Sequence, residues 1–324
     1  MRIRASSTIS HQPTFRNPGF SLKISALNEG SVLQGPDYGL FIPAMDRRRM
    51  SDILKMSIAC SVDCLQQAGI DQPDAIIVGT SMGCSVHTKT FLDKIAASHG
   101  ELIAPTAFIV STHNTIAGQI SMLLKTHGYN MTHTQNTLSF EQALIDAMLC
   151  MENGYKNILV GGGDEMEDTI YNMKARLNDE NLHLTCGASF FILSDEDGGN
   201  DAIKLVDVES FGLTREPFAD IKNFLGDHHL MAADIDLVLY SNSEEVKTIE
   251  LVEYFGADKI LNYQEFTGTY YTSSAMAMHY AIDKLQYGHL EKGKEKNHVL
   301  ICNNLIPENL GLILLSQNIA GEID

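Results

Sequence analysis

The sequence predicts a layered α/β fold built from two similar lobes. Short β-branched strands, several ending in glycine, alternate with amphipathic helices, and the same order of elements occurs twice along the chain. The first copy ends near residues 195–202, so we expect a first lobe over residues 1–197 and a shorter second lobe over residues 198–324. Duplicated units of this kind pack as a pseudo-twofold pair that shares one core.

The elements of the first lobe follow from their local patterns. Residues 50–68 are predicted to be a helix, because apolar side chains recur at helical spacing between the potential N-cap Ser51 and the terminating Gly69. Residues 74–79 (DAIIVG) have the composition of a buried strand that runs into a tight turn, and a helix is expected from Ser85 onward. The other predicted elements are helices at residues 117–125 and 140–152 and strands at residues 157–160 (NILV) and 188–194 (ASFFILS).

The second lobe repeats these elements. After the acidic segment 195–201 (DEDGGND), a strand at residues 235–240 (IDLVLY) resembles the strand at residues 74–79. The further matched pairs are the helices 273–287 and 140–152, the strands 298–302 and 157–160, and the strands 310–316 and 188–194.

The charge balance excludes several classes of partner. With 23 Lys and Arg against 41 Asp and Glu, the net charge of −18 repels nucleic acid and anionic membranes. No apolar run approaches the ~18 residues that span a bilayer, and the N-terminus has no apolar segment of a secretory signal, so we expect no membrane insertion and a cytoplasmic location. The six cysteines form no C-x-x-C pair, and neither they nor His228-His229 have metal-ligand spacing, so we predict free thiols, no metal and no cofactor.

Several motifs resemble a known family. Residues 111–122 (STHNTIAGQISM) resemble the segment before the nucleophile of β-ketoacyl synthases, and residues 143–166 resemble their helix, glycine, strand and G-G-x-E-E run. Residues 267–268 and the small residues 272–275 resemble the T-G-H-x-x-G-A-A motif of the second lobe. Residues 139–141 resemble a run in the short, N-terminal-domain-like synthases of aryl-polyene and flexirubin-type pigment clusters. The resemblance implies the thiolase-like αβαβα layered fold of this superfamily.

The residues that carry condensation chemistry in that family are replaced in this chain. Active synthases place a cysteine thiolate at the N-terminus of a buried helix, where the helix dipole and backbone N–H groups favour it. The matching position here is Thr137. Asn242 and Thr269 stand where the histidines of the H-G-T and T-G-H motifs are expected. Gln264 replaces the upstream lysine, and residues 303–307 (NNLIP) replace the glycine-rich gate.

The resemblance implies a subunit without condensing activity of its own, so we assign no catalytic residue. Its implied role is that of a chain-length factor, which pairs across the lobe-one sheet with an active β-ketoacyl-ACP synthase in fatty-acid-like, polyene or polyketide biosynthesis. A homodimeric, acyl-binding scaffold is the alternative. Acyl carrier proteins are strongly acidic, and the only dense basic cluster of this chain is Arg47-Arg48-Arg49, so we expect the carrier protein to dock mainly on the partner.

Two glycine-rich segments allow other interpretations. Residues 79–83 (GTSMG) match G-x-S-x-G and follow a strand, which is the context of a hydrolase nucleophile at Ser81, although a tight turn is the favoured interpretation. Glycines 161–163 lack the Lys-Ser/Thr of a phosphate loop and are predicted to form a close-packed turn.

The hydroxyls at the start of the predicted helix 140–152 allow another alternative. Ser139 or Thr137 could replace the thiol in an acyl-transfer or hydrolytic reaction, with His113 or His133 as the base. Capping of the helix or lining of a tunnel is the favoured role of both hydroxyls.

Overall fold

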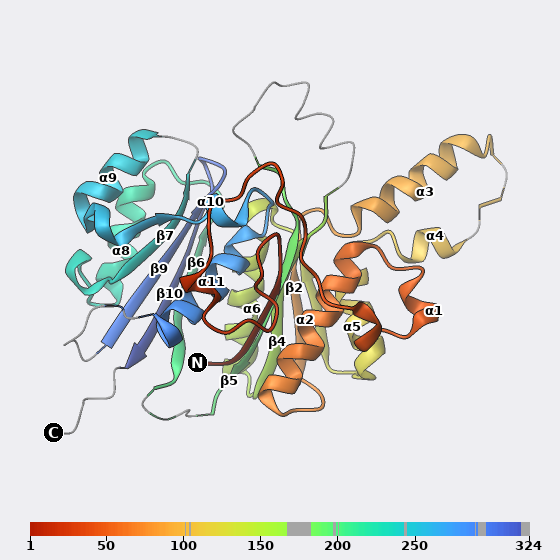
Figure 1. The fold of residues 1–324 in the computed structure, drawn as a ribbon, viewed down its shortest axis with the longest axis horizontal. Coiled ribbons are helices and arrows are strands. Elements are labelled where there is room, and N and C mark those ends of the chain that lie inside the picture. The colour runs from red at the N-terminus through yellow and green to blue at the C-terminus, as the bar shows by residue number, and fades with distance from the viewer. Residues whose placement is uncertain are drawn as a thin grey trace.

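One ten-stranded mixed sheet runs through the molecule in the computed structural model, which describes residues 1–100, 102–103, 105–166, 183–196, 199, 201–242, 245–288, 290 and 296–318 (Figure 1). The strands are β1 (Arg2–Ile9), β2 (Ala75–Gly79), β3 (Tyr129–His133), β4 (Asn157–Asp164), β5 (Gly187–Ser194), β6 (Ile203–Phe211), β7 (Leu237–Asn242), β8 (Ile260–Asn262), β9 (Lys296–Asn304) and β10 (Leu310–Asn318). Their order is β3-β2-β4-β5-β1-β6-β10-β9-β7-β8. Read inward from its outer edge, the first half has the order β3-β2-β4-β5-β1 and the second half has the order β8-β7-β9-β10-β6. The two halves therefore have the same arrangement of successive strands.

Matched contacts in the two halves reveal the internal repeat. In the first half the Asp74 carboxylate accepts a hydrogen bond from the backbone N–H of Asn157 at 2.9 Å. In the second half the Asp236 carboxylate accepts the equivalent bond from the N–H of His298 at 2.8 Å. These contacts align β2 with β7 and β4 with β9, as the sequence predicts. The lobe boundary between residues 197 and 198 stays a prediction.

Helices form three layers around the two half-sheets. The described helices are α1 (Ala44–Arg47), α2 (Asp52–Ala68), α3 (Ser85–Ala97), α4 (Pro105–Ile109), α5 (Thr115–Leu124), α6 (Ser139–Glu152), α8 (Pro217–Asp227), α9 (Glu245–Phe255), α10 (Gln264–Thr267) and α11 (Ser273–Tyr287). α6 and α11 lie between the half-sheets, and one buried apolar cluster joins them to strands of both (Figure 1). α2 and α5 cover the outer face of the first half-sheet, and α8 and α9 cover that of the second. The αβαβα prediction is confirmed.

Glycines 161–163 lie inside β4, so the predicted turn is wrong. A Cβ atom on Gly161 would lie 2.3 Å from the ring of Phe190, and one on Gly163 would lie 2.8 Å from the side chain of Ile53. Glycine is required here because neighbouring side chains pack directly against the strand, not because the chain reverses direction.

Two strands of the second lobe end later than predicted. β7 ends at Asn242 rather than at residue 240, and β9 ends at Asn304 rather than at residue 302. Asn242 and Asn304 oppose each other in the parallel ladder. Polar residues with a turn-like composition therefore extend these strands, because their backbone groups pair between neighbours.

α2 begins at Asp52, and Ser51 occupies its N-cap position without a hydrogen bond from its side chain to the backbone of the first turn. The predicted capping interaction is therefore absent. The carboxylate of Glu165 lies there instead and accepts a 3.4 Å hydrogen bond from the N–H of Ile53. Gly69 ends the helix in the left-handed conformation, as predicted.

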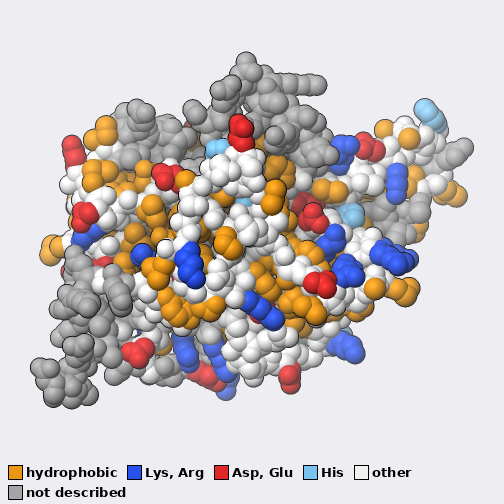
Figure 2. All heavy atoms as spheres, in the orientation of Figure 1, with side chains coloured by type: hydrophobic (Ala, Val, Ile, Leu, Met, Phe, Trp, Pro, Cys, Tyr) orange, Lys and Arg blue, Asp and Glu red, His pale blue; other side chains and the backbone are white. Residues whose placement is uncertain are grey.

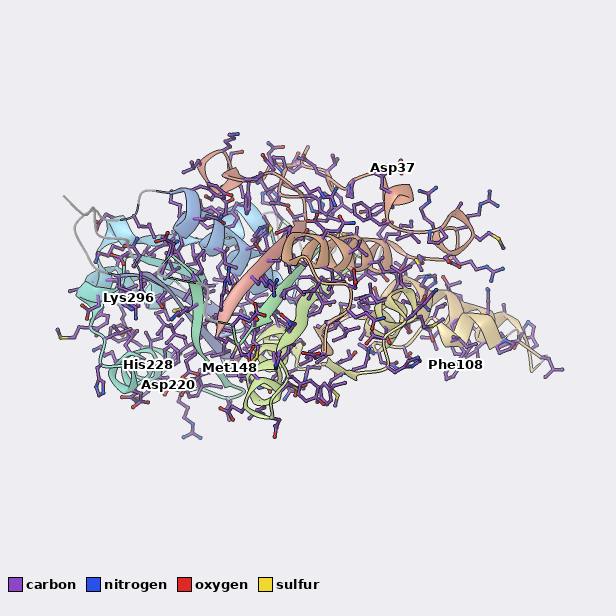
Figure 3. The ribbon with its side chains drawn as sticks, turned by 90° about the horizontal axis from the view of Figure 1, so that it is seen from below. Asp37, Phe108, Met148, Asp220, His228 and Lys296 are labelled. Carbon is purple, nitrogen blue, oxygen red and sulfur yellow. The ribbon has the colours of Figure 1, made fainter. Side chains whose placement is uncertain are left out.

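α3 and α4 form an arm that projects from the first lobe, on the side away from the second lobe (Figure 1; Figure 3). α3 has no buried side chain, and Val86, Leu92 and Ile95 are 38%, 55% and 43% exposed. The rings of Phe91 and Phe108 hold the two helices together, with centroids 5.5 Å apart. An arm with this much exposed apolar surface is unusual in a monomer.

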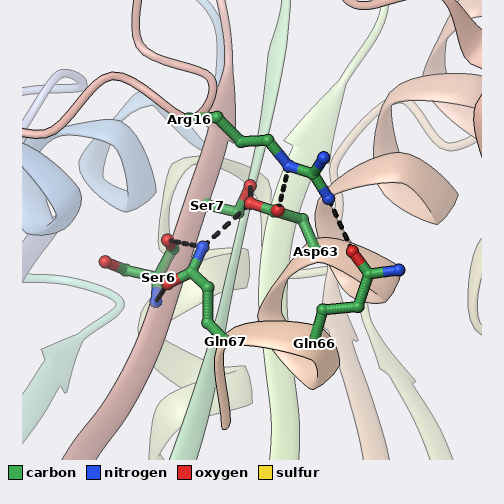
Figure 4. A network of polar contacts seen from close by, with 6 residues as sticks. All are labelled: Ser6, Ser7, Arg16, Asp63, Gln66 and Gln67. Atoms are coloured by element: carbon green, nitrogen blue, oxygen red, sulfur yellow. Dashed lines mark hydrogen bonds and ion pairs between the residues drawn. The ribbon is translucent and has the colours of Figure 1, made fainter. Parts of the chain in front are cut away.

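An ion pair between the half-exposed Arg16 and the buried Asp63 ties the segment after β1 to α2 (Figure 4). The Arg16 Nε donates to Asp63 Oδ1 at 2.5 Å, and the Ser7 hydroxyl donates to Asp63 Oδ2 at 2.7 Å. Arg16 has a positive φ of 50°, a strained conformation for a residue other than glycine. The network fixes this turn beside α2.

Basic side chains gather over α1 and the start of α2 (Figure 2). Arg47, Arg48 and Lys55 line a shallow pocket of about 420 Å³ there. None of the helices in the described ranges is long and apolar enough to cross a membrane.

Candidate functional site

The elbow that leads into α6 holds the position predicted for the nucleophile. After β3 the chain makes a 3₁₀ turn, Asn136–Leu138, in which Asn136 has a positive φ of 56°. Thr137 follows and is fully buried. The Ser139 hydroxyl donates to the carbonyl of Asn136 at 2.7 Å and accepts from the N–H of Gln135 at 2.8 Å. Ser139 thus closes the elbow, but it is the first residue of α6 and not its N-cap, which is Leu138, so the predicted capping of the helix by its hydroxyl is absent.

Asparagines from the second lobe fill the space around Thr137. The Asn303 Nδ2, at the end of β9, donates to the Thr137 carbonyl at 2.8 Å and to Glu141 Oε1 at 2.9 Å. The Asn309 Nδ2 donates to the Thr137 hydroxyl at 3.0 Å. We call Asn303 and Asn309 the plug. The carbonyl and the hydroxyl of Thr137 are thereby bound by residues 303–309, a segment that includes the predicted replacement of the gate.

The carboxyl of Glu141, for which no role was predicted from the sequence, lies under the plug. Glu141 is fully buried on α6, and burial raises its pKa, although the hydrogen bond from Asn303 acts in the opposite direction. Gly311 on β10 makes room for it, because a Cβ atom there would lie 2.7 Å from Glu141 Cγ. Glu141 Oε1 accepts the second hydrogen bond of Asn303, so this buried carboxyl holds the plug in place.

The strand end that carries Asn242 meets the plug through its neighbour Ser241. The Tyr263 hydroxyl donates to Ser241 Oγ at 2.8 Å, and Ser241 Oγ lies 3.5 Å from Asn303 Oδ1. Asn242 is the last residue of β7, and its side chain lies outside the described part of the structure. This end of β7 is therefore joined to the elbow by Asn303.

Thr269 lies apart from the plug. Its backbone bridges to Leu184, and its hydroxyl accepts a 3.4 Å hydrogen bond from the side chain of Gln264. Gly268 has a positive φ of 67°, and a Cβ atom there would lie 2.3 Å from Thr185. The T-G-T segment thus packs tightly beside residues 183–185, and no described hydrogen bond joins Thr269 to Thr137.

Ser81 lies in a tight turn that is closed by a buried carboxylate. The Thr80 hydroxyl and the N–H groups of Ser81 and Met82 donate to Asp164 Oδ1 at 2.9, 2.8 and 2.7 Å. Within the described ranges the Ser81 hydroxyl has no hydrogen bond to a histidine. The turn interpretation is therefore favoured over an esterase elbow.

The two candidate bases have structural partners. His133 Nε2 lies 2.8 Å from the Asp146 carboxylate, which also accepts from the Tyr129 hydroxyl at 3.1 Å. His113 packs against the turn, because a Cβ atom on Gly83 would lie 2.8 Å from its ring. Neither histidine has a described hydrogen bond to Ser81 or Ser139, so neither serine has the base that a hydroxyl nucleophile needs.

Asp164 and Glu165 are structural residues whose contacts were not predicted from the sequence. Asp164 Oδ2 accepts from both the N–H and the hydroxyl of Thr272, at 3.1 and 2.8 Å, and thereby joins the Ser81 turn to the start of α11. Glu165 accepts from the N–H of Val86 at 2.9 Å, at the start of α3. Burial raises the pKa of both carboxyls, and the hydrogen bonds they accept lower it in part.

Solved structures with the same fold are ketosynthases and their complexes. The ishigamide ketosynthase/chain length factor aligns with a TM-score of 0.81 at 14% identity over 98% of this chain and 99% of that chain. The ketosynthase ApeO in complex with its chain length factor ApeC, from Xenorhabdus doucetiae, aligns at 0.74 and 15% over 98% of both. A type II polyketide acyl-carrier protein in complex with its ketosynthase, AntDE:AntF, aligns at 0.73 and 13% over 98% and 99%.

The sequence itself matches a family. The family model described as "Beta-ketoacyl synthase, N-terminal domain" matches residues 33–203, which is more than half of the chain. A search of curated proteins found no match. The matched residues include the elbow, α6 and β4, whose order and packing are those of the thiolase fold. The chain therefore belongs to the β-ketoacyl synthase N-terminal-domain family.

Proposed function

We propose that this protein is a non-catalytic, chain-length-factor-like subunit that pairs with an active β-ketoacyl-ACP synthase. The observation that carries the proposal is the plug. Thr137 stands at the nucleophile position, its carbonyl is held by Asn303, and its hydroxyl is held by Asn309. The carbonyl and the hydroxyl of Thr137 are thus occupied by the chain itself, and no thiol stands at this position to attack a thioester, so we infer that the fold serves another purpose.

The surface that we assign to the partner is the outer edge of the first half-sheet. β3 lies at that edge, and among the described strands it pairs with β2 alone. The backbone N–H and C=O groups on its other side therefore have no partner strand in the described part of the sheet. Its Met131 side chain is 40% exposed, and the apolar residues of the α3–α4 arm flank this side of the lobe. An open, uncharged edge strand is a template for pairing with another chain. A partner seated here would cover both the edge and the arm.

The neighbours with the same fold support this arrangement. Two of them are named as a ketosynthase with its chain length factor, and a third is named as an acyl-carrier protein in complex with its ketosynthase. We propose polyene or polyketide biosynthesis as the pathway class and the cytoplasm as the location. The carrier protein docks on the partner in this proposal.

Co-expression with a candidate β-ketoacyl-ACP synthase from the same source tests the pairing. We expect the two chains to co-purify and to elute together from a sizing column. Met131→Asp would place a charge on the β3 edge and should abolish co-elution without unfolding the chain. Met231→Asp is the matched control, because Met231 is 68% exposed on the second lobe, away from the edge.

Three results would contradict the proposal. Elongation of a malonyl-derived chain by this protein alone would show that it is catalytic. Absence of a complex with the ketosynthase would remove the partner. A dimer of this chain alone that Met131→Asp dissociates, with no affinity for the ketosynthase, would establish the homodimeric alternative.

A further inference from the structure

A pocket of about 430 Å³ opens in the second lobe, at the carboxyl ends of β7 and β9 and beside the start of α8. From β7 the chain passes through α9 to β8 on one side, and it then returns through α11 to β9 on the other side. The pocket therefore lies at the topological switch point of this half-sheet, which is where open α/β sheets bind ligands. Its volume is also within the range of small-molecule sites.

The matching edge of the first lobe is closed by the chain's own carboxylates. The repeat aligns Gly163 with Asn304. Asp164, the last residue of β4, and Glu165 after it therefore occupy the positions that follow Asn304 in the second lobe. Asp164 and Glu165 fill that edge by accepting hydrogen bonds from the neighbouring turn and helix starts. The second lobe has no carboxylate at the matching place, and its edge stays open.

The lining of the pocket combines an apolar wall with few polar groups. Phe218, Ile221, Leu251 and Leu310 form the wall. Asn304 is 6% exposed and lines the pocket, and its Nδ2 donates to the carbonyls of the following turn. Its Oδ1 accepts no hydrogen bond from the described residues, and so it can accept one from an N–H or O–H group of a ligand.

The donors of the pocket lie nearer its mouth. Arg215 lines the pocket and has no ion pair within the described ranges, and the Tyr240 hydroxyl has no described hydrogen bond. These two groups can donate to a carbonyl oxygen. Glu216 and Glu250 are exposed at the same rim, so the rim carries one positive and two negative charges. A carboxylate ligand would therefore meet net repulsion.

We propose that this pocket binds an uncharged acyl amide. The apolar chain packs against the wall, the amide N–H donates to Asn304 Oδ1, and the amide carbonyl accepts from Tyr240 or Arg215. An amide is the neutral group that supplies a donor and an acceptor side by side. The proposal does not depend on the pairing with a ketosynthase, because the pocket is complete within one chain.

Isothermal titration calorimetry with octanamide, octanoate and octylamine tests the proposal on the full-length protein. We expect octanamide to bind with a dissociation constant at least tenfold below those of the two charged analogues, which corresponds to about 1.4 kcal/mol. Ala219→Leu fills the pocket from the first turn of α8 and should abolish binding. Ala257→Leu, at an exposed position of the same lobe, is the matched control and should leave binding unchanged.

A second variant tests the assigned polar contact. Tyr240→Phe removes one hydroxyl and should weaken octanamide binding about two- to tenfold, as expected for one hydrogen bond. Tighter binding of octanoate or octylamine than of octanamide would overturn the assignment of an amide. Unchanged octanamide binding in Ala219→Leu, with the fold intact by circular dichroism, would place the ligand elsewhere and overturn the site.

Discussion

The two lobes share a strand order but finish the same edge of the sheet in opposite ways. In the first lobe, β4 ends in Gly163-Asp164, and the Asp164 carboxylate accepts five hydrogen bonds from Thr80, Ser81, Met82 and Thr272. In the second lobe the matching residues are Asn304 and Leu305, which carry no charge. The first lobe thus uses the edge to hold the fold together, whereas the second lobe supplies the plug and leaves a pocket.

The largest expected effect tests the structural role of the first edge. Asp164→Ala leaves several buried donors of the Ser81 turn and of Thr272 without an acceptor, and each such group costs about 1–3 kcal/mol. We expect a loss of about 3–5 kcal/mol in the free energy of unfolding, measured by urea denaturation with circular dichroism.

Leu305→Ala is the matched control in the second lobe. Leu305 is half-buried and occupies the position that corresponds to Asp164, so its truncation should cost about 1 kcal/mol or less. Equal losses in the two variants would show that the lobes do not divide these roles.

The layers of the fold were predicted from the sequence, but the two strands at the centre of the sheet were not. β2, β4, β5, β7, β9 and β10 were predicted from buried apolar runs, and the fold follows from their repetition. β1 and β6, which join the half-sheets, were missed. Their patterns, RIRASSTI and IKLVDVESF, interleave polar and apolar residues and form no continuous apolar run of the kind seen in the predicted strands. Ser7 and Thr8 are buried in β1 only because Asp63, Ser189 and His279 bond to them.

The elbow before α6 was expected from the sequence but its contacts were not, and the match of Thr137 to the nucleophile position stays a prediction. The sequence placed Thr137 at the elbow because a recognisable helix, glycine and strand follow it. It could not predict the plug, because Asn303 and Asn309 reach Thr137 across more than 160 residues of chain. Glu141 and Asp164 were also missed as buried groups, since a carboxyl is buried only where its tertiary partners allow it.

The central helices also differ in their buried titratable groups. α6 carries Glu141, whereas α11 carries His279, whose Nδ1 lies 2.8 Å from the Thr8 hydroxyl. Thr8 donates its proton to Ser189, so Nδ1 is the donor to Thr8. Burial lowers the pKa of His279 to about 4.

The second prediction uses this pKa. In the unfolded chain the imidazole titrates at its ordinary pKa of about 6.5, so protonation favours unfolding as the pH falls from about 6.5 to about 4. The stability is complete above this window, and about 3 kcal/mol is lost across it. Raised carboxyl pKa values such as that of Glu141 act in the opposite direction, so the difference between variants is the quantity to measure.

His279→Asn keeps a donor toward Thr8 and removes the titration. We expect the wild-type free energy of unfolding to fall by about 3 kcal/mol more than that of the variant between pH 7 and pH 4, from urea curves at each pH. His127→Asn, at an exposed position, should follow the wild type. Parallel curves for wild type and His279→Asn would show that the imidazole is not held neutral.

The last prediction concerns the reactivity of a thiol introduced at the elbow. This substitution has the smallest expected effect on stability. Thr137→Cys restores the thiol of active synthases at the elbow, but the plug should keep it inert. We expect no alkylation of Cys at this position by iodoacetamide under native conditions, followed by peptide mapping to separate it from the six natural cysteines. Those cysteines in apolar surroundings have pKa values raised by burial, so they form a slow background.

Removing the plug should release the same thiol. The repeat aligns Asn303 with Gly162, so Asn303→Gly gives the second lobe the residue that the first lobe already has, and Asn309→Ala removes the remaining contact. With both changes added, the thiol lies at the N-terminus of α6, where the helix dipole lowers a thiol pKa, and alkylation should become several-fold faster. Fast alkylation of Thr137→Cys with the plug intact would show that the elbow is open. The plug would then not support the proposed absence of condensing activity, which would depend only on the predicted replacement of the cysteine and histidines.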